Sequence, residues 1–438
     1  MIGNIVSQFY NMADTIIVGR FVSTDALAAV GLTGSLFFLI IGFAGGMCQG
    51  FTIPLARCFG AKDMEKVRVY LANTIYLSLA FVVIITVAML LTTDDILRLM
   101  NTPKKIESLA HDYIFTIFAG LFASVAYNLC ACVSRAVGDS RTPLYFLILA
   151  AVLNVILDLV FVIAFDWKTF GVGFATVVAQ AISAICCFFY MRKKFPELSF
   201  NGETGKPSLR IMIELIIVGI PMALQFSITA VGSIILQSAV NTLGIDAIAT
   251  ITAASKAQMI LIQPFDALGS TNATYSSQNL GAERLDRIKK GVAVSVIFCA
   301  IVSAVAFAIA NTVGADIARM FVDDADFTSI RPGIQQFFFI NSLFYFALGV
   351  LIVLRNTIQG LGYTLPAMIA GVFEMVARAS VGVIIVEMFG FIGAVSGNPV
   401  AWVAANILLV PVYFIVINRL KRTLPSTKNI QRESEQKR

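Results

Sequence analysis

The chain of 438 residues is 58% hydrophobic and only 13% charged, and its mean hydropathy is +0.85. An ordinary soluble domain carries about 25% charged residues, so this composition excludes a soluble globular protein. It indicates a chain that lies mostly in lipid, with its few charges confined to loops and tail.

Charge-poor stretches of about 20 residues are long enough to cross a bilayer as helices, and about twelve of them follow one another along the chain. They lie at 1–21, 30–56, 70–92, 109–133, 144–165, 170–191, 211–243, 250–277, 291–313, 332–358, 367–389 and 391–418. They show no sustained alternation of period two and are too long for barrel strands. The expected fold is therefore an all-α integral membrane protein with about twelve transmembrane helices.

Basic residues fall on alternate sides of these predicted spans. Of the 32 Lys and Arg residues, 23 follow even-numbered spans, end span 10 (Arg355) or lie in the tail, and seven lie in the opposite loops. By the positive-inside rule, the side with 23 is cytoplasmic. We therefore expect a multi-pass protein with both termini in the cytoplasm.

An internal repeat divides the chain into two pseudosymmetric halves. Thr24–Val30 aligns with Ile245–Ile251 at an offset of 221 positions, and the same offset brings Gly60-Ala61 onto Gly281-Ala282. Each half holds six spans, so the two are parallel repeats, which are typical of secondary transporters that rock two bundles about a central site.

The repeat predicts the domain organisation. We expect a six-helix lobe at 1–191, a cytoplasmic linker at 192–210, a second six-helix lobe at 211–418 and a basic cytoplasmic tail at 419–438. Met1 aligns with Met222, so nothing in the first half matches Leu209–Pro221. We therefore expect the first helix to be shortened at its N-terminus.

Little in the sequence suits catalysis or a resident metal. The seven cysteines form no CxxC pair, the single histidine (His111) lies in a predicted outer loop, and there is no glycine-rich phosphate loop. We expect no enzyme activity, no cofactor and no metal beyond a bound Na⁺. The net charge of +6 fits loops that touch anionic lipid, so we expect membrane lipids and not nucleic acid as partners.

Ionisable residues within a membrane are costly and usually functional. Asp14 and Asp158 each lie seven residues before the outer end of their span, which places both about 10 Å below the outer surface. Thr176 lies at about the same depth in its span, and Asn154 lies one turn deeper on the same helix face as Asp158. These four residues form either an oxygen-rich site for a cation or proton, or ordinary hydrogen bonds between helices.

Other polar residues in the spans have less specific roles. Glu374 and Arg378 are four positions apart, and we expect a structural ion pair. Lys256 opens span 8, where its long side chain can reach the interface. The candidates for the wall of a substrate cavity are Gln8, Asn11, Gln49 and Gln180.

Two segments carry a resemblance to a known family. Tyr10–Arg20, followed by Ala26–Val30, resembles the first-helix signature of the multidrug and toxic compound extrusion (MATE) family, and Gln278–Ala282 resembles the end of that family's eighth helix. In the DinF-like branch, the resemblance implies a cation site made by an Asp in helix 1, an Asn and Asp four apart in helix 5, and a Thr in helix 6. The matching residues are Asp14, Asn154, Asp158 and Thr176.

The NorM-like branch has instead a Glu in helix 7, about eight residues after its proline, and Thr229 stands at that position here. The resemblance therefore implies no cation site of that type in the second half. The family's first helix also has a proline-bearing start, and this chain begins after it.

The resemblance implies a Na⁺- or H⁺-coupled antiporter of a prokaryotic inner membrane, a monomer that exports amphipathic, often cationic organic compounds. The alternative in the same broader superfamily is a flippase for a lipid-linked saccharide or peptidoglycan precursor. Such flippases favour basic residues in a central cavity, for which the spans offer Lys256 and Arg378.

Overall fold

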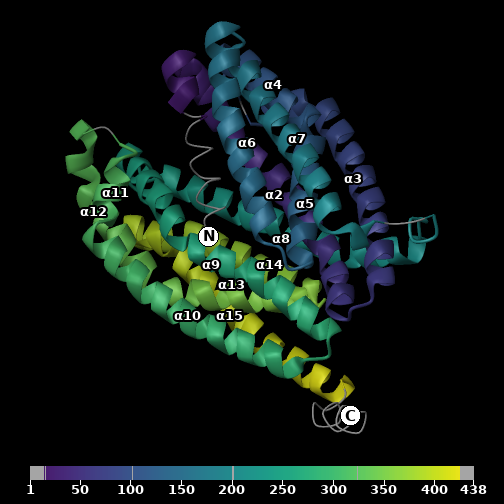
Figure 1. The fold of residues 1–438 in the computed structure, drawn as a ribbon. Coiled ribbons are helices and arrows are strands. Elements are labelled where there is room, and N and C mark those ends of the chain that lie inside the picture. Colours follow the sequence, from purple (N-terminus) through teal and green to yellow (C-terminus); the bar gives the residue numbers. More distant parts are fainter. Residues whose placement is uncertain (1–13, 15, 101, 200–201, 323, 425–438) are drawn as a thin grey trace. The chain divides into compact units, whose positions relative to one another are not determined.

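The computed structural model describes residues 14, 16–100, 102–199, 202–322 and 324–424. The described residues form helices, turns and loops and contain no strand (Figure 1). Residues 14 and 16–21 are helical and form the end of the first predicted span. The expected shortening of that helix lies outside the described residues.

The chain forms two compact units, residues 2–223 and 224–438. The helices of the first unit are α2 (Thr24–Gly60), α3 (Met64–Leu99), α4 (Lys104–Ala119), α5 (Leu121–Ala136), α6 (Arg141–Leu159), η1 (Val160–Ala164), α7 (Lys168–Lys194) and η2 (Pro196–Leu198). Helix α8 (Leu209–Asn241) starts in this unit and continues into the second.

The second unit repeats much of this order. Its helices are α9 (Ile245–Gly281), α10 (Leu285–Thr312), α11 (Gly314–Arg319), α12 (Asp324–Leu343), α13 (Tyr345–Gly360), α14 (Thr364–Ser380), η3 (Val381–Ile385) and α15 (Val386–Thr423).

The described helices are long and apolar enough for multiple membrane crossings. Eight pass this test by themselves, and the bent pairs α4/α5 and α12/α13 each pass as one broken span. The segment Thr364–Thr423 is 60 residues long and is interrupted at Gly390, where φ is 54° and ψ is −127°. It is long enough for two crossings, as the predicted spans 367–389 and 391–418 require.

The sequence repeat is also a repeat of local geometry. Helices α2 and α9 start and end 221 positions apart, and so do the π-helical turns η1 and η3. The bend at Gly120 between α4 and α5 measures 47°, and the bend at Phe344 between α12 and α13 measures 48°. Each unit thus contains the same broken span and the same π turn.

The linker packs against α3 of the first unit. The Asn73 side-chain oxygen accepts a hydrogen bond from the Ser208 backbone N–H at 2.7 Å, and the Tyr76 hydroxyl donates to the Gly205 carbonyl at 2.9 Å. Leu215 of α8 is completely buried in a cluster with Met47 and other apolar residues of this unit. These contacts explain why the first compact unit extends to Ala223, beyond the linker where the sequence places the lobe boundary.

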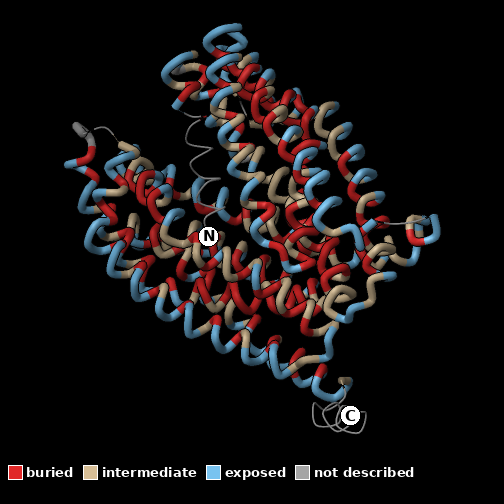
Figure 2. Tube along the Cα trace, viewed as in Figure 1, coloured by how far each residue is buried: buried red, intermediate tan, exposed pale blue. Residues whose placement is uncertain are grey.

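Helix α10 shows how these helices divide their surface. Buried and exposed positions alternate along it, as they do along the other long helices in Figure 2. Many of its buried side chains are small, and many of its exposed ones are large and apolar. The buried positions include Ser295, Cys299, Ser303, Ala306 and Ala310, and the exposed ones include Val294, Ile297, Phe298, Ile301 and Val305. Small residues let helix backbones approach closely, and large apolar residues suit contact with lipid.

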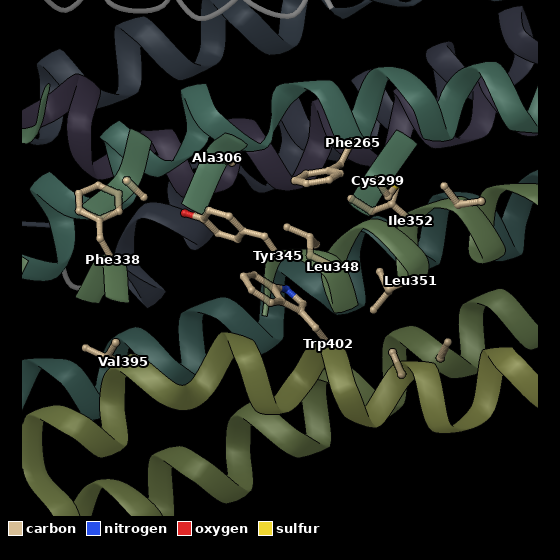
Figure 3. Packing of buried hydrophobic residues seen from close by; sticks show 14 of the residues in the cluster. Phe265, Cys299, Ala306, Phe338, Tyr345, Leu348, Leu351, Ile352, Val395 and Trp402 are labelled. Carbon is tan, nitrogen blue, oxygen red and sulfur yellow. The ribbon is translucent and has the colours of Figure 1, made fainter. Parts of the chain in front are cut away.

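The largest buried apolar cluster lies in the second unit. Tyr345 of α13 is fully buried between Phe265 of α9 and Trp402 of α15 (Figure 3). Its hydroxyl accepts a hydrogen bond from the Gln258 amide at 3.4 Å. Burial of such aromatic side chains fixes α9, α13 and α15 relative to one another.

Candidate cation site

Helices α6 and α7 bring three of the four predicted site residues together. Asn154 and Asp158 lie one turn apart on α6 and are both fully buried, and Thr176 of α7 is 3% exposed. The Asn154 amide nitrogen donates to the Thr176 hydroxyl oxygen at 3.3 Å, and that hydroxyl donates to the Val172 carbonyl at 3.1 Å. The two bonds fix the orientation of the Asn154 amide, so its nitrogen makes the contact between α6 and α7 and its oxygen does not.

Asp14 completes the group from the first helix. Its side chain is 7% exposed, and its carboxyl group lies within hydrogen-bonding reach of the Asp158 carboxyl group. Apolar residues surround the pair, among them Ile17, Val18 and Val162. The structure therefore places all four predicted residues in one buried cluster.

The cluster is rich in acceptor oxygens and poor in donors. Oδ1 of Asp14, Oδ1 of Asn154 and both carboxylate oxygens of Asp158 are buried without a hydrogen-bond partner in the described part of the chain. Buried polar atoms without partners are costly. Two carboxylates in contact cannot both be charged in apolar surroundings unless a cation lies between them. The arrangement suits either a proton shared by the acids or a small cation that prefers oxygen ligands.

Tyr113 of α4 is a further member that the sequence analysis missed. It is 7% exposed, belongs to the apolar cluster around the site and lies near both carboxyl groups. Gly173 of α7 makes this approach possible, because a Cβ there would lie 3.1 Å from the Tyr113 carbonyl oxygen. A single Tyr in an apolar span carries no spacing signal, so only the packing of α4 on α7 reveals it.

The four candidates for a substrate cavity remain predictions. Gln8 and Asn11 lie outside the described residues. Gln49 is half-buried on α2. Gln180 lies one turn after Thr176 on α7, and its side-chain oxygen accepts a hydrogen bond from the Ser124 hydroxyl of α5.

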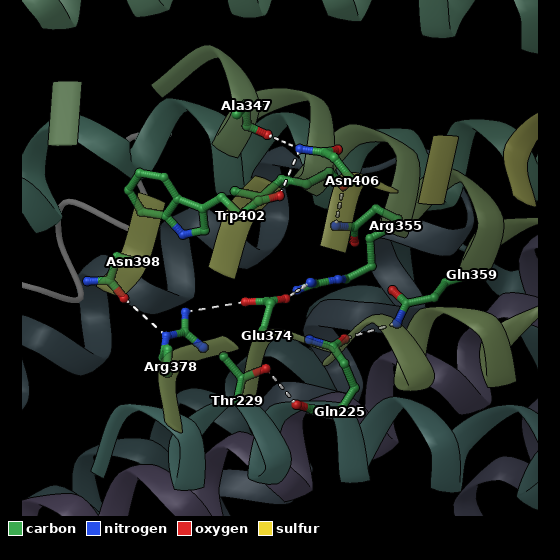
Figure 4. Close-up of polar contacts among 12 residues, drawn as sticks. Gln225, Thr229, Ala347, Arg355, Gln359, Glu374, Arg378, Asn398, Trp402 and Asn406 are labelled. Carbon is green, nitrogen blue, oxygen red and sulfur yellow. Dashed lines mark hydrogen bonds and ion pairs between the residues drawn. The ribbon is translucent and has the colours of Figure 1, made fainter. Parts of the chain in front are cut away.

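The second unit contains a different buried cluster, which is shown in Figure 4. Glu374 and Arg378 form an ion pair at 3.3 Å, and Arg355 of α13 binds the other carboxylate oxygen of Glu374. Arg378 also donates through Nε to the Asn398 side-chain oxygen of α15 at 3.1 Å. The predicted pair is thus part of a group of three charges that joins α13, α14 and α15.

Two charged residues of this unit lie in environments that the sequence did not predict. The sequence predicts that Arg355 belongs to the cytoplasmic basic residues, but the structure buries it within α13, where it is 7% exposed. Asp266 lies in the middle of α9 and was not recognised as a charge within a span, although its position in 250–277 was a sufficient signal. It is exposed and lies close enough to Arg355 to interact with it electrostatically.

Comparison with known proteins establishes the family. The sequence model of the MatE family matches residues 1–160 and 221–384, which is most of the chain and includes both halves of the repeat. The chain belongs to the MatE family. The resemblance drawn from the first and eighth helices is therefore confirmed.

Several MatE relatives are similar over long stretches. "Probable multidrug resistance protein YoeA" of Bacillus subtilis strain 168 is 27% identical over 303 residues, which cover 68% of this chain and 65% of that protein, slightly less than two thirds of its length. "Multidrug export protein MepA" of Staphylococcus haemolyticus is 23% identical over 422 residues, or 96% of this chain and 92% of that protein.

Solved MatE structures share the fold. A crystal structure described as MATE in complex with MaL6 superposes with a TM-score of 0.90 at 23% identity and covers 96% of this chain and 95% of its own. The outward-facing conformation of a multidrug resistance MATE family transporter of the MOP superfamily also has a TM-score of 0.90 at 23% identity, with 96% and 94% covered. The predicted all-α membrane fold is confirmed.

Proposed function

We propose that this MatE protein is a multidrug efflux antiporter that exports amphipathic, often cationic organic compounds in exchange for Na⁺ or H⁺. The family match and the relatives named for multidrug resistance and export support the substrate class. The observation that carries the coupling is the buried cluster of unpartnered oxygens at Asp14, Asn154 and Asp158.

The cluster can couple a cation to the position of the first helix. Asp14 comes from that helix, whereas Asn154 and Asp158 come from α6, and Thr176 of α7 fixes the amide. With a proton or Na⁺ bound, the two carboxyl groups attract one another through it, and the helices are held together. Without it, two negative charges repel one another in apolar surroundings, and the first helix is driven from α6. Such a difference between the two states is what a coupled transporter requires.

The remaining expectations complete this proposal. We place the protein in the inner membrane of a prokaryote as a monomer with both termini cytoplasmic, on the basis of the loop charges. Two lobes of six helices would alternate between outward-open and inward-open arrangements, as parallel repeats do in other transporters. We propose no resident cofactor and no nucleic-acid partner.

The flippase alternative receives less support from the basic residues of the spans. Arg355 and Arg378 both bind Glu374, so neither guanidinium is free to receive a phosphate group without losing that partner. Lys256 is exposed, with its ammonium 5.9 Å from the ring centre of Phe321. A single lysine is a weak basis for recognition of a lipid-linked pyrophosphate.

The decisive experiment is dye efflux from proteoliposomes in which a Na⁺ gradient and a pH gradient are imposed separately. We expect the wild type to respond to one of the two gradients, and that gradient identifies the ion. Asp14→Asn removes one carboxylate with little change in size and should abolish the gradient-driven flux. Asp166→Asn is the matched control, because Asp166 is exposed in the turn between η1 and α7.

Two results would contradict the proposal. Gradient-driven efflux at the wild-type rate by Asp14→Asn would show that the buried acids are not the coupling site. Loss of flux in Asp166→Asn to the same extent would show that any carboxylate change in this unit disturbs transport. Circular dichroism and elution from a size-exclusion column establish that both variants are folded.

A further inference from the structure

We infer that the first unit carries a binding site for one anionic phospholipid at the end of α7, separate from the cation site. A cavity of about 480 Å³ lies there between α3, α5 and α7 and is closed at one end by η2. Helix α5 packs on both α3 and α7, and η2 contacts α3 and α7. The site plays no part in the transport chemistry proposed above.

The wall of the cavity has the composition expected for an acyl chain. It is lined almost entirely by aliphatic, aromatic and sulfur-containing side chains, among them Leu71, Leu129, Ile185, Phe188 and Phe195. Ile185 and Phe188 are 56% and 47% exposed, so the cavity is open along the outer side of α7. An opening lined by large apolar side chains is accessible from the lipid phase.

One end of the cavity carries a positive charge. Among the described residues that line it, Arg192 is the only charged one, and Ser199, which follows η2, adds a hydroxyl group. Lys193 follows Arg192 in the last turn of α7, and both are exposed. None of the described residues that line the cavity is a carboxylate, so its charge favours an anionic head group over a cationic drug.

The length of the site matches a head group followed by a chain. Arg192 lies eight residues after Ala184 on α7, and both line the cavity, so it extends about 12 Å along the helix. Basic pockets between transmembrane helices on the cytoplasmic side are typical binding sites for anionic lipid head groups. An anionic phospholipid fits this site, with its phosphate against Arg192 at the charged end and one acyl chain along the apolar wall toward Ala184.

The test is competitive lipid binding, measured by native mass spectrometry of the purified full-length protein. Phosphatidylglycerol and phosphatidylcholine with identical acyl chains are added in equal amounts, and the ratio of the two singly bound species is determined. We expect the wild type to prefer phosphatidylglycerol. Arg192→Gln should lower this preference about fivefold, which is the contribution of one basic residue near a lipid head group.

Matched variants separate a site from general attraction to basic residues. Lys193→Gln removes a neighbouring charge that does not line the cavity and should leave the preference within about twofold of the wild type. Ala126→Phe fills the cavity from α5, where Ala126 is exposed, and should reduce binding of both lipids. Val152→Phe adds bulk on α6 outside the cavity, where Val152 is 53% exposed, and should change neither.

Three outcomes would overturn the inference. Equal effects of Arg192→Gln and Lys193→Gln would indicate diffuse electrostatic attraction without a site. Undiminished lipid binding by Ala126→Phe would show that no acyl chain enters the cavity. A cationic dye that displaces phosphatidylglycerol from the wild type, and that binds the Arg192→Gln variant more tightly than the wild type, would identify a drug site instead.

Discussion

The buried charges of the second unit allow a sharp prediction about stability. The side chain of Glu374 is 3% exposed and lies between Arg355 and Arg378, whose side chains are 9% and 5% exposed. Glu374→Gln keeps the size of the side chain and removes the negative charge. Two guanidinium groups then remain buried without a counter-charge within the group of three.

The expected loss is large. Removal of one partner of a buried ion pair destabilises proteins by about 3–5 kcal/mol, because the remaining charge stays desolvated. The mutation leaves two positive charges facing one another, so the upper end of this range is expected. Nε of Arg355 and Nη1 of Arg378 already have no hydrogen-bond partner in the described part of the chain. Asp266 interacts with Arg355, but its side chain is exposed, so it compensates for only part of the lost charge.

The assay is unfolding of the purified protein in mixed micelles, in which the fraction of a denaturing detergent is increased and helix content is followed by circular dichroism. Glu387→Gln is the control, because Glu387 is exposed in the first turn of α15. It should change the free energy of unfolding by less than about 0.5 kcal/mol.

A triple variant tests the physical reason. Arg355→Met, Glu374→Leu and Arg378→Met together replace the three charges by apolar groups of similar length, which should restore most of the stability lost in Glu374→Gln. A loss below about 1 kcal/mol in Glu374→Gln would refute the reasoning, because it would mean that the arginines are solvated. A triple variant as unstable as the single one would attribute the loss to packing and not to charge.

Three other predictions concern single contacts. Thr176→Val removes the hydroxyl that fixes the Asn154 amide, so the apparent affinity for the coupling ion in the efflux assay should fall about tenfold or more. The free energy of unfolding should not change, and a variant with wild-type ion affinity would contradict this prediction. Burial opposes ionisation of Asp139, but the Lys194 ammonium 2.7 Å away lowers its pKa below the usual 3.8. Asp139→Asn should therefore cost about 1–2 kcal/mol in unfolding assays. That difference should be complete above pH 3.8 and disappear as the pH falls further, and a difference that grows in acid would contradict it. Gly360→Ala places a Cβ against the Ala273 carbonyl group and should lower the free energy of unfolding by about 1–3 kcal/mol. An unchanged free energy of unfolding would show that α13 and α9 move apart easily.

The fold was largely predictable because lipid imposes a simple rule on sequence. A span needs an apolar stretch of a fixed length, and such stretches stand out from loops that carry most of the charge. The breaks within spans were not predictable in the same way. The bends at Gly120 and Phe344 and the π turns η1 and η3 depend on how neighbouring helices pack, which hydropathy does not record.

The candidate site was predictable to the extent that it depends on helical spacing and depth. Asn154 and Asp158 share a face because they are four apart, and the acids were noticed because charges are rare in spans. Tyr113 and Arg355 required the tertiary structure. Tyr113 reaches the acids only through the close approach of α4 to α7, and Arg355 had to be placed in three dimensions before its partner Glu374 was evident.

The repeat also explains why coupling is expected in one half only. In each unit, two polar residues four apart lie shortly before a π turn: Asn154 and Asp158 before η1, and, one position earlier in the repeat, Glu374 and Arg378 before η3. In the first unit this pair contributes a carboxylate that meets a second carboxylate, Asp14. In the second unit it contributes an acid already bound by two arginines. The same backbone therefore supports a group that needs an added cation in one half and a group that supplies its own cations in the other.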